Sequence, residues 1–213
     1  MNTLVFQSEN NQKKVSSVGK SVVMILTGWF LLVLAVALTG NFNVVKGAQP
    51  LPTLFAVLMP VGLFGLAYFS LASFKAWVLA LDIRHLILLH SWRMVGMGFV
   101  FLYFQNKLPA LFALPAGLGD AMAAMGALFL GIALYDQAEK ISKNKIFMWN
   151  TFGLIDFVIA ISMGLMTRVG EPFHFSGQVG SDIMSTFPLV LIPGFAVPFY
   201  VIVHLIIYAK LRA

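Results

Sequence analysis

Six long apolar runs, separated by short polar breaks, constrain this chain more than any other feature of its sequence. The hydrocarbon core of a bilayer needs about 20 helical residues to cross it, and each run has roughly that length. The runs lack the alternating pattern of barrel strands, so helices are expected. The sequence predicts an all-α, polytopic membrane bundle with about six transmembrane helices, at residues 21–39, 51–74, 85–104, 110–135, 147–166 and 187–208.

Composition agrees with a single transmembrane domain over residues 21–213, preceded by a polar cytoplasmic tail of residues 1–20. The chain is 60% apolar and only 10% charged, whereas about a quarter of an ordinary soluble domain is charged. The absence of cysteine excludes disulfide exchange, thiolate metal sites and iron–sulfur clusters. No segment is long enough to form the basic soluble face that nucleic-acid binding needs, so we expect no nucleic-acid partner.

The positions of the basic residues predict an orientation. If the N-terminus is cytoplasmic, ten Lys and Arg fall on the cytoplasmic side, three fall outside and Arg93 is intramembrane. Short cytoplasmic loops carry an excess of basic residues, so the sequence predicts that both termini face the cytoplasm. The ten are Lys13, Lys14, Lys20, Lys75, Arg84, Lys140, Lys143, Lys145, Lys210 and Arg212, and the three are Lys46, Lys107 and Arg168.

One alternative concerns the first helix. Ala35-Val36-Ala37 has the small-x-small pattern of a signal-peptidase site and follows an apolar run. Cleavage there would leave five helices with the new N-terminus outside. The polar leader is long for a signal peptide, so the uncleaved six-helix topology is favoured, and the alternative stays open.

Three charged residues fall near the middle of predicted helices. Arg93, Asp120 and Asp156 lie one each in the third, fourth and fifth helix, at depths of about nine to eleven residues from the nearer end. A charge at the bilayer centre costs about 2.5–3.5 kcal/mol on insertion scales, so contact with lipid is disfavoured. Small residues accompany each charge at helical spacing, which favours close helix contact there. We expect the three side chains to meet inside the bundle.

Two interpretations of this cluster stay open. In one, it is a structural staple that fixes the order of the helices in a non-catalytic membrane partner or assembly subunit. In the other, one positive and two negative groups at mid-membrane bind a small solute, an ion or a proton. The run that contains Pro115, Gly117 and Gly119 directly precedes Asp120 and predicts an unwound turn beside that carboxylate.

A haem group is a further alternative. His90 and His204 lie at similar depths from the cytoplasmic end, as bis-histidine ligation of haem b across a bundle requires. The loop residues Glu171, His174 and Asp182 match no recognised metal site, and no catalytic motif is found. We therefore predict no metal, no cofactor and no catalytic residue, with haem as the alternative.

From Arg93 onward the chain resembles a group of uncharacterised bacterial multi-pass membrane proteins. The resemblance has no assigned activity but implies a bacterial inner (cytoplasmic) membrane location, and it adds Asn150 to the candidate site. It rests on Arg93-x-x-Gly96, on Leu108-Pro109-x-x-Phe112-Ala113-x-Pro115-Ala116-Gly117-x-Gly119-Asp120, on Trp149-Asn150-x-x-Gly153-Leu154-x-Asp156, and on Pro193, Pro198 and His204.

The leading hypothesis is transport or conduction of a small solute or ion. Asp120 and Asp156 would carry a coupled proton, and Arg93 would supply the counter-charge. The partners expected are the lipid bilayer and this solute, and a homo-oligomer remains open.

Overall fold

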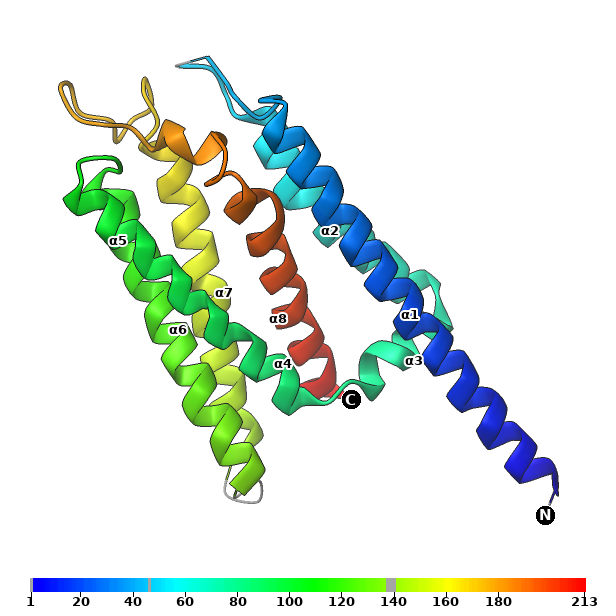
Figure 1. The fold of residues 1–213 in the computed structure, drawn as a ribbon. Coiled ribbons are helices and arrows are strands. Elements are labelled where there is room, and N and C mark those ends of the chain that lie inside the picture. Colours follow the sequence, from blue (N-terminus) through cyan, green and yellow to red (C-terminus); the bar gives the residue numbers. More distant parts are fainter. Residues whose placement is uncertain (1, 46, 137–140) are drawn as a thin grey trace.

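Every regular element in the part of the chain that the structure describes is a helix (Figure 1). The computed structural model describes residues 2–45, 47–136 and 141–213, with side chains from residue 17 onward. The prediction of six long apolar helices is confirmed, which indicates a membrane protein. These segments are Ser17–Leu38, Leu51–Ser70, Ile83–Phe104, Ala110–Asp136, Lys143–Met166 and Ile192–Arg212.

The first two helices differ from the prediction at one end each. Helix α1 covers Asn2–Leu38, so the segment predicted as a polar tail continues the helix. Helix α2 covers Leu51–Ser70 and ends before the predicted residue 74, because Leu71 has an extended backbone with φ −113° and ψ 99°. The chain then forms a separate short helix, α3 (Ala72–Ala80).

The third membrane-length segment is not a uniform α-helix. Helix α4 (Ile83–Leu89) begins at Asp82, whose side chain accepts a hydrogen bond from the Arg84 amide. A 3-10 helix, η1 (His90–Gly96), follows it, and α5 (Met97–Phe104) completes the segment. A 3-10 turn has three residues per turn instead of 3.6, so η1 changes the direction in which its side chains project.

The remaining segments are α6 (Ala110–Asp136) and α7 (Lys143–Met166), then the 3-10 helix η3 (Ser181–Ser185) in the long loop. The last predicted segment, 187–208, begins in turns, and its helix starts with a π turn, η4 (Ile192–Ala196), and continues as α8 (Val197–Arg212). Prolines at 188, 193 and 198 lack an amide hydrogen, which accounts for this irregular start.

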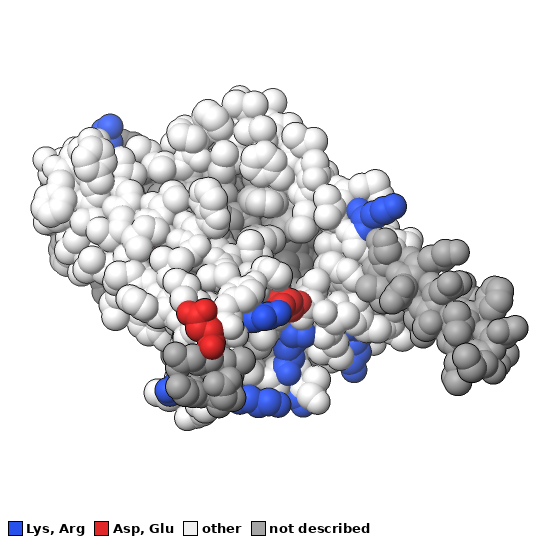
Figure 2. All heavy atoms as spheres, turned by 60° about the horizontal axis from the view of Figure 1, so that its bottom comes forward, with Lys and Arg blue, Asp and Glu red and all other residues white. Residues whose placement is uncertain are grey.

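Successive long helices run in opposite directions, so both termini lie at the same end of the molecule (Figure 1). Figure 2 brings this end forward and shows Lys and Arg gathered over it. Helix α6 packs against the α4–η1–α5 segment on one side and α7 on the other, while α8 packs against α2 and α7. Apolar clusters fill the bundle at both ends, one around Ile87, Trp149 and Ile207 and the other around Phe99, Leu108 and Phe112.

Candidate functional site

Arg93 occupies the centre of the bundle. It lies in η1, and only 1% of its side chain is exposed. The 3-10 turn directs the Arg93 side chain into the space between α6, α7 and α8, and its polar partners belong to these three helices. The prediction that the three mid-helix charges meet inside the bundle agrees with this arrangement.

The guanidinium group of Arg93 binds both predicted aspartates through different nitrogens. Nε donates to Asp120 Oδ1 at 2.7 Å, and Nη2 donates to Asp156 Oδ2. Nη1 donates to the carbonyl oxygen of Gly153 at 3.2 Å, and the guanidinium carbon lies 3.9 Å from the centre of the Phe157 ring. One residue of η1 therefore connects α6 to α7 through charged hydrogen bonds, which are among the strongest in proteins.

His204 and Asn150 extend this network to α8. The amide nitrogen of Asn150 donates to the carbonyl oxygen of His204 at 3.1 Å, so its side-chain oxygen accepts from His204 Nδ1 at 2.7 Å. A neutral histidine protonated on Nδ1 carries a lone pair on Nε2. That atom lies 3.2 Å from Arg93 Nη1 and accepts a hydrogen bond from it. We name Arg93, Asp120, Asp156, Asn150 and His204 the Arg93 cluster.

Three glycines provide the space for the Arg93 cluster. A Cβ atom on Gly96 would collide with Asp120 Oδ2, and one on Gly119 would collide with Asp156 Oδ1. A Cβ atom on Gly153 would lie 2.6 Å from His204 Cε1 and 3.0 Å from Arg93 Nη1. Each polar side chain therefore lies directly over the backbone of a neighbouring helix, and any larger residue at these positions would displace it.

The structure does not contain the unwound turn predicted before Asp120. Helix α6 runs from Ala110 to Asp136 without interruption, and Pro115 lies inside it. Gly117 and Gly119 serve close packing instead: a Cβ atom on Gly117 would lie 2.7 Å from Val100 Cγ2, and Gly119 makes room for Asp156. The departures from α geometry occur in η1 and η4, on the helices that face α6 and α2.

His90 and His204 lie side by side rather than across a gap. Their ring centres are 4.1 Å apart, and the planes are inclined by 34°. Bis-histidine haem needs an iron atom and its porphyrin between two rings, each with a nitrogen about 2 Å from the metal. His204 uses both nitrogens in hydrogen bonds, so this arrangement does not fit haem b. His90 is fully buried, and its two nitrogens have no hydrogen-bond partner in the described part of the chain.

The acidic and histidine residues of the long loop have separate partners. Glu171 accepts from Gln49 Nε2 at 2.7 Å, and His174 Nε2 lies 3.0 Å from the carbonyl oxygen of Gln178. Asp182 accepts from the Val169 amide at 2.9 Å. Among the described residues, no group of three or more His, Cys, Asp or Glu is placed to hold a metal ion.

Arg168 belongs to the interior, although the sequence counted it among the loop residues. Its side chain is only 5% exposed, and Nη2 lies 3.3 Å from Asp182 Oδ1. Nη1 donates to Ser185 Oγ at 3.0 Å, which fixes η3 against the end of α7. The sequence places Arg168 and Asp182 in one loop, but their spacing matches no known motif, so this ion pair was not predicted.

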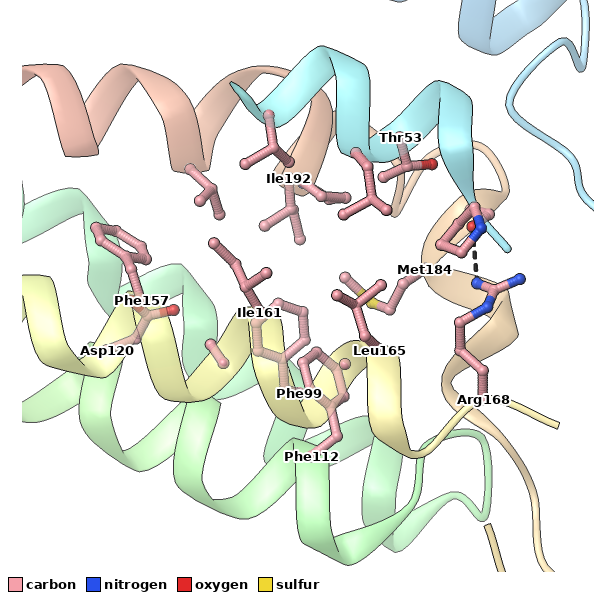
Figure 3. Close-up of a pocket in the computed structure, with 18 residues that line it drawn as sticks. Thr53, Phe99, Phe112, Asp120, Phe157, Ile161, Leu165, Arg168, Met184 and Ile192 are labelled. Carbon is pink, nitrogen blue, oxygen red and sulfur yellow. Dashed lines mark hydrogen bonds between the residues drawn. The ribbon is translucent and has the colours of Figure 1, made fainter. Parts of the chain in front are cut away.

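A cavity of about 90 Å³ joins these two polar regions (Figure 3). Asp120 lies at one end of it, and Arg168 with Ser185 lies at the other. Between these two ends, the wall consists mainly of aromatic and branched apolar side chains. Thr53 adds a polar atom to the wall, and its buried hydroxyl has no hydrogen-bond partner in the described residues. The apolar wall includes Phe99, Phe112, Phe157, Ile161, Leu165, Met184 and Ile192.

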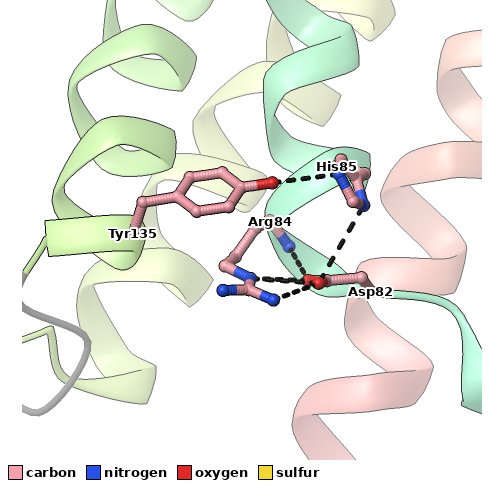
Figure 4. Close-up of polar contacts among 4 residues, drawn as sticks. All are labelled: Asp82, Arg84, His85 and Tyr135. Carbon is pink, nitrogen blue, oxygen red and sulfur yellow. Dashed lines mark hydrogen bonds and ion pairs between the residues drawn. The ribbon is translucent and has the colours of Figure 1, made fainter.

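A second ion-pair group lies where α4 begins and α6 ends (Figure 4). Arg84 donates to both carboxylate oxygens of Asp82 at 2.5–3.0 Å, and His85 Nε2 lies 2.9 Å from the Tyr135 hydroxyl. The side-chain hydrogen bond from Arg84 lowers the pKa of Asp82 to about 2, against a smaller opposing effect of burial. We name Asp82, Arg84, His85 and Tyr135 the Asp82 cluster; sequence reasoning did not single it out.

In the described residues, the fold and the buried ion pairs define a helical protein with six long apolar segments and a polar centre. The chain belongs to the family described as a domain of unknown function (DUF8737), whose match covers residues 49–212. No curated protein and no solved structure matches the chain. The family region includes α2 and every residue of the Arg93 cluster, and it is consistent with the expected resemblance to an uncharacterised family. Helix α1 lies outside it.

Proposed function

We propose that this protein transports or conducts a small solute or ion across a bacterial inner membrane, with a proton carried by the Arg93 cluster. Both termini would face the cytoplasm, since most basic residues lie at that end. The loop that contains Arg168 and η3 would then face the outside. The observation that carries the proposal is the cavity, because it extends from that loop to a carboxylate at mid-membrane depth.

The charge of the Arg93 cluster suits a proton or a small cation. Arg93 binds two carboxylates and supplies one positive charge, so the cluster has a net charge of −1 when both are ionised. Asp120 faces the cavity, and 14% of its side chain is exposed, whereas Asp156 is 6% exposed. A charged group inside a membrane is expensive and is generally associated with ion or proton pathways. Asp120 is therefore the proposed point of entry for the proton.

The size of the cavity limits what it holds. A volume of about 90 Å³ is well below the ~300–1,000 Å³ of ordinary small-molecule pockets, so the cavity suits a few waters or one small solute. The other half of the bundle, between the Arg93 cluster and the termini, is filled by apolar side chains around Ile87, Trp149 and Ile207. The described conformation would thus give access from the loop side alone, and transport would require the packed half to open.

Proton flux into vesicles tests the proposal. The purified protein is reconstituted into liposomes that contain a pH-sensitive dye, and a potassium gradient with valinomycin supplies the driving force. Asp120→Asn and Asp156→Asn should each abolish the flux, and the matched variant Asp82→Asn should retain it, because that carboxylate lies at the surface. Wild-type flux no higher than that of empty liposomes, or full flux in both mid-membrane variants, would overturn the proposal.

A variant that fills the cavity tests the proposal without changing the ion pairs of Arg93. Ala160 lines the cavity and belongs to α7. Ala160→Phe should fill the space and reduce the flux while the Arg93 cluster remains intact. Val158 lies on the same helix and is 60% exposed, so Val158→Phe is the matched control and should transport normally.

A structural role is the second candidate, and one observation favours it. Arg93 is almost completely buried, and each of its three nitrogens is hydrogen-bonded, which is what a staple between helices requires. The protein would then be a non-catalytic membrane partner or assembly subunit. In that case, Asp120→Asn and Asp156→Asn would lower the melting temperature of the purified protein, and the wild type would show no flux.

A further inference from the structure

A second and larger cleft lies beside α1. Its volume is about 1190 Å³, which exceeds the ~300–1,000 Å³ of ordinary small-molecule pockets. Residues of α1, α2, α3, α4 and α8 line it, and most of them are apolar. The apolar wall includes Val22, Ile25, Leu26, Leu32, Leu63, Leu66, Phe199 and Ile202.

The cleft exists because α1 contacts the rest of the molecule at two separate points. Near one end, a Cβ atom on Gly19 would lie 3.2 Å from Trp77 Nε1 of α3. Toward the other end, the rings of Trp29 and Phe195 are 4.5 Å apart. Between these contacts lies Gly28, where a Cβ atom would have no other atom within 4 Å. The protein's own side chains therefore leave this space open.

Polar groups gather at one end of the cleft. Among the lining residues, Ser17 and Ser21 come from α1, and Ser70 and Ser73 come from the junction of α2 and α3. Two exposed lysines, neither of which lines the cleft itself, are adjacent in the chain to lining residues: Lys20 precedes Ser21, and Lys75 follows Phe74. Lys75 Nζ lies 5.6 Å from the centre of the Tyr68 ring. This is the end at which the termini lie and the basic residues gather (Figure 2). The cleft thus has a long apolar wall and a hydroxyl-bearing end, and two exposed lysines are next to that end in the chain.

We infer that this cleft binds one anionic phospholipid. The acyl chains lie along the apolar wall, and the phosphate group lies at the serine and lysine end. Burial of apolar chains supplies most of the free energy of binding, and each lysine near an anionic headgroup strengthens the binding further. Charge complementarity separates this occupant from a zwitterionic lipid, which would gain little from Lys20 and Lys75. The inference does not depend on transport through the Arg93 cluster.

The first experiment fills the cleft. The delipidated, full-length protein in detergent is titrated with dioleoyl phosphatidylglycerol, and bound lipid is counted by native mass spectrometry. The wild type should retain one lipid, and Gly28→Leu should retain none, because the leucine occupies the apolar wall. A Cβ atom on Gly98 would likewise have no other atom within 4 Å, and Gly98 does not line the cleft, so Gly98→Leu is the matched control and should bind normally.

The second experiment tests the basic end. The double variant Lys20→Gln/Lys75→Gln should bind phosphatidylglycerol about 10- to 30-fold more weakly, as the loss of two lysines near a headgroup implies. Lys145→Gln, an exposed lysine of α7 at the same end, should have no effect. Equal binding of phosphatidylcholine, unchanged binding by Gly28→Leu, or a protein dimer that excludes lipid would each overturn the inference. Proton flux that survives in Gly28→Leu would separate this site from the proposed transport pathway.

Discussion

The Arg93 cluster and the Asp82 cluster use the same side chains in opposite environments. Each combines an arginine, an aspartate and a histidine, and in each the arginine also lies over an aromatic ring. The side chain of Arg93 is 1% exposed and that of Arg84 is 41% exposed. Exposed ion pairs contribute about 0–1 kcal/mol, whereas loss of one partner from a buried pair leaves an uncompensated charge and costs about 3–5 kcal/mol.

The two clusters also differ in the sequence separation between the residues that they pair. Asp82 and Arg84 are two residues apart, and their contact is part of the start of α4. Arg93 pairs with residues 27 and 63 positions away. The exposed pair therefore determines where one helix begins, while the buried pairs determine which helices lie together.

Loss of either arginine should show the largest contrast. Arg93→Met leaves two carboxylates buried without a counter-charge, and we expect it to lose about 3–5 kcal/mol of stability or to fail to fold. Arg84→Met should lose far less stability, because its ion pair with Asp82 is exposed to solvent. Thermal unfolding of both purified variants in the same detergent measures the difference. Equal melting temperatures would mean that burial does not distinguish the two clusters.

Replacement of a glycine by alanine, which adds one methyl group, should give the next largest difference in stability. Gly119→Ala places a Cβ atom against Asp156, and we expect a loss of about 1–3 kcal/mol as the network shifts. Gly98→Ala meets no atom within 4 Å, and it should be neutral or slightly stabilising because alanine favours helix. The melting temperature of Gly119→Ala should fall, and that of Gly98→Ala should stay the same or rise slightly. A similar small change in both would contradict close packing around the Arg93 cluster.

The loop pair Arg168–Asp182 provides an intermediate case. Asp182 accepts from the Val169 amide and faces buried Arg168, so Asp182→Leu removes both interactions, and we expect a loss of about 1–3 kcal/mol. Limited proteolysis of the loop should become faster in this variant. Glu171→Leu in the same loop removes only an exposed hydrogen bond to Gln49 and should leave the rate of cleavage unchanged.

The smallest expected effect concerns pH. The pKa of Asp82 is lowered from 3.8 to about 2 in the folded protein, chiefly by the Arg84 side chain. Its stabilisation is therefore fully present above about pH 4 and is lost as the pH falls toward 2. The difference in melting temperature between the wild type and Asp82→Asn should shrink over this range and stay constant from about pH 5 to 8. A difference that grows on acidification would contradict the assigned shift.

Contacts could be predicted from the sequence where the depth of a residue in the membrane is enough to determine its partners. Arg93, Asp120 and Asp156 could be placed together because charges at one depth in a membrane bundle have few other partners. Asn150 entered through the resemblance, and the three glycines through small-residue spacing. The link between His204 and Arg93 could not be foreseen, because the 3-10 turn of η1 rotates Arg93 in a way that helical periodicity does not describe.

Other features depend on packing between distant segments. The burial of Arg168 depends on η3 folding back onto α7, and the cavity depends on side chains from α2, α5, α6, α7 and η4. The prediction of an unwound turn before Asp120 was wrong for a similar reason. Taken alone, Pro115 and the glycines indicate a break in the helix, but packing against Val100 and Asp156 stabilises a continuous α6.

The two-point attachment of α1 has a consequence for the order in which the protein assembles. One of its contacts is with Gly194 and Phe195, which follow α1 by more than 150 residues and leave the ribosome long after it. Domains and segments fold as synthesis proceeds from the N-terminus. Helix α1 therefore completes its docking only after residues 194 and 195 have been made, although it precedes the other five long apolar segments in the chain.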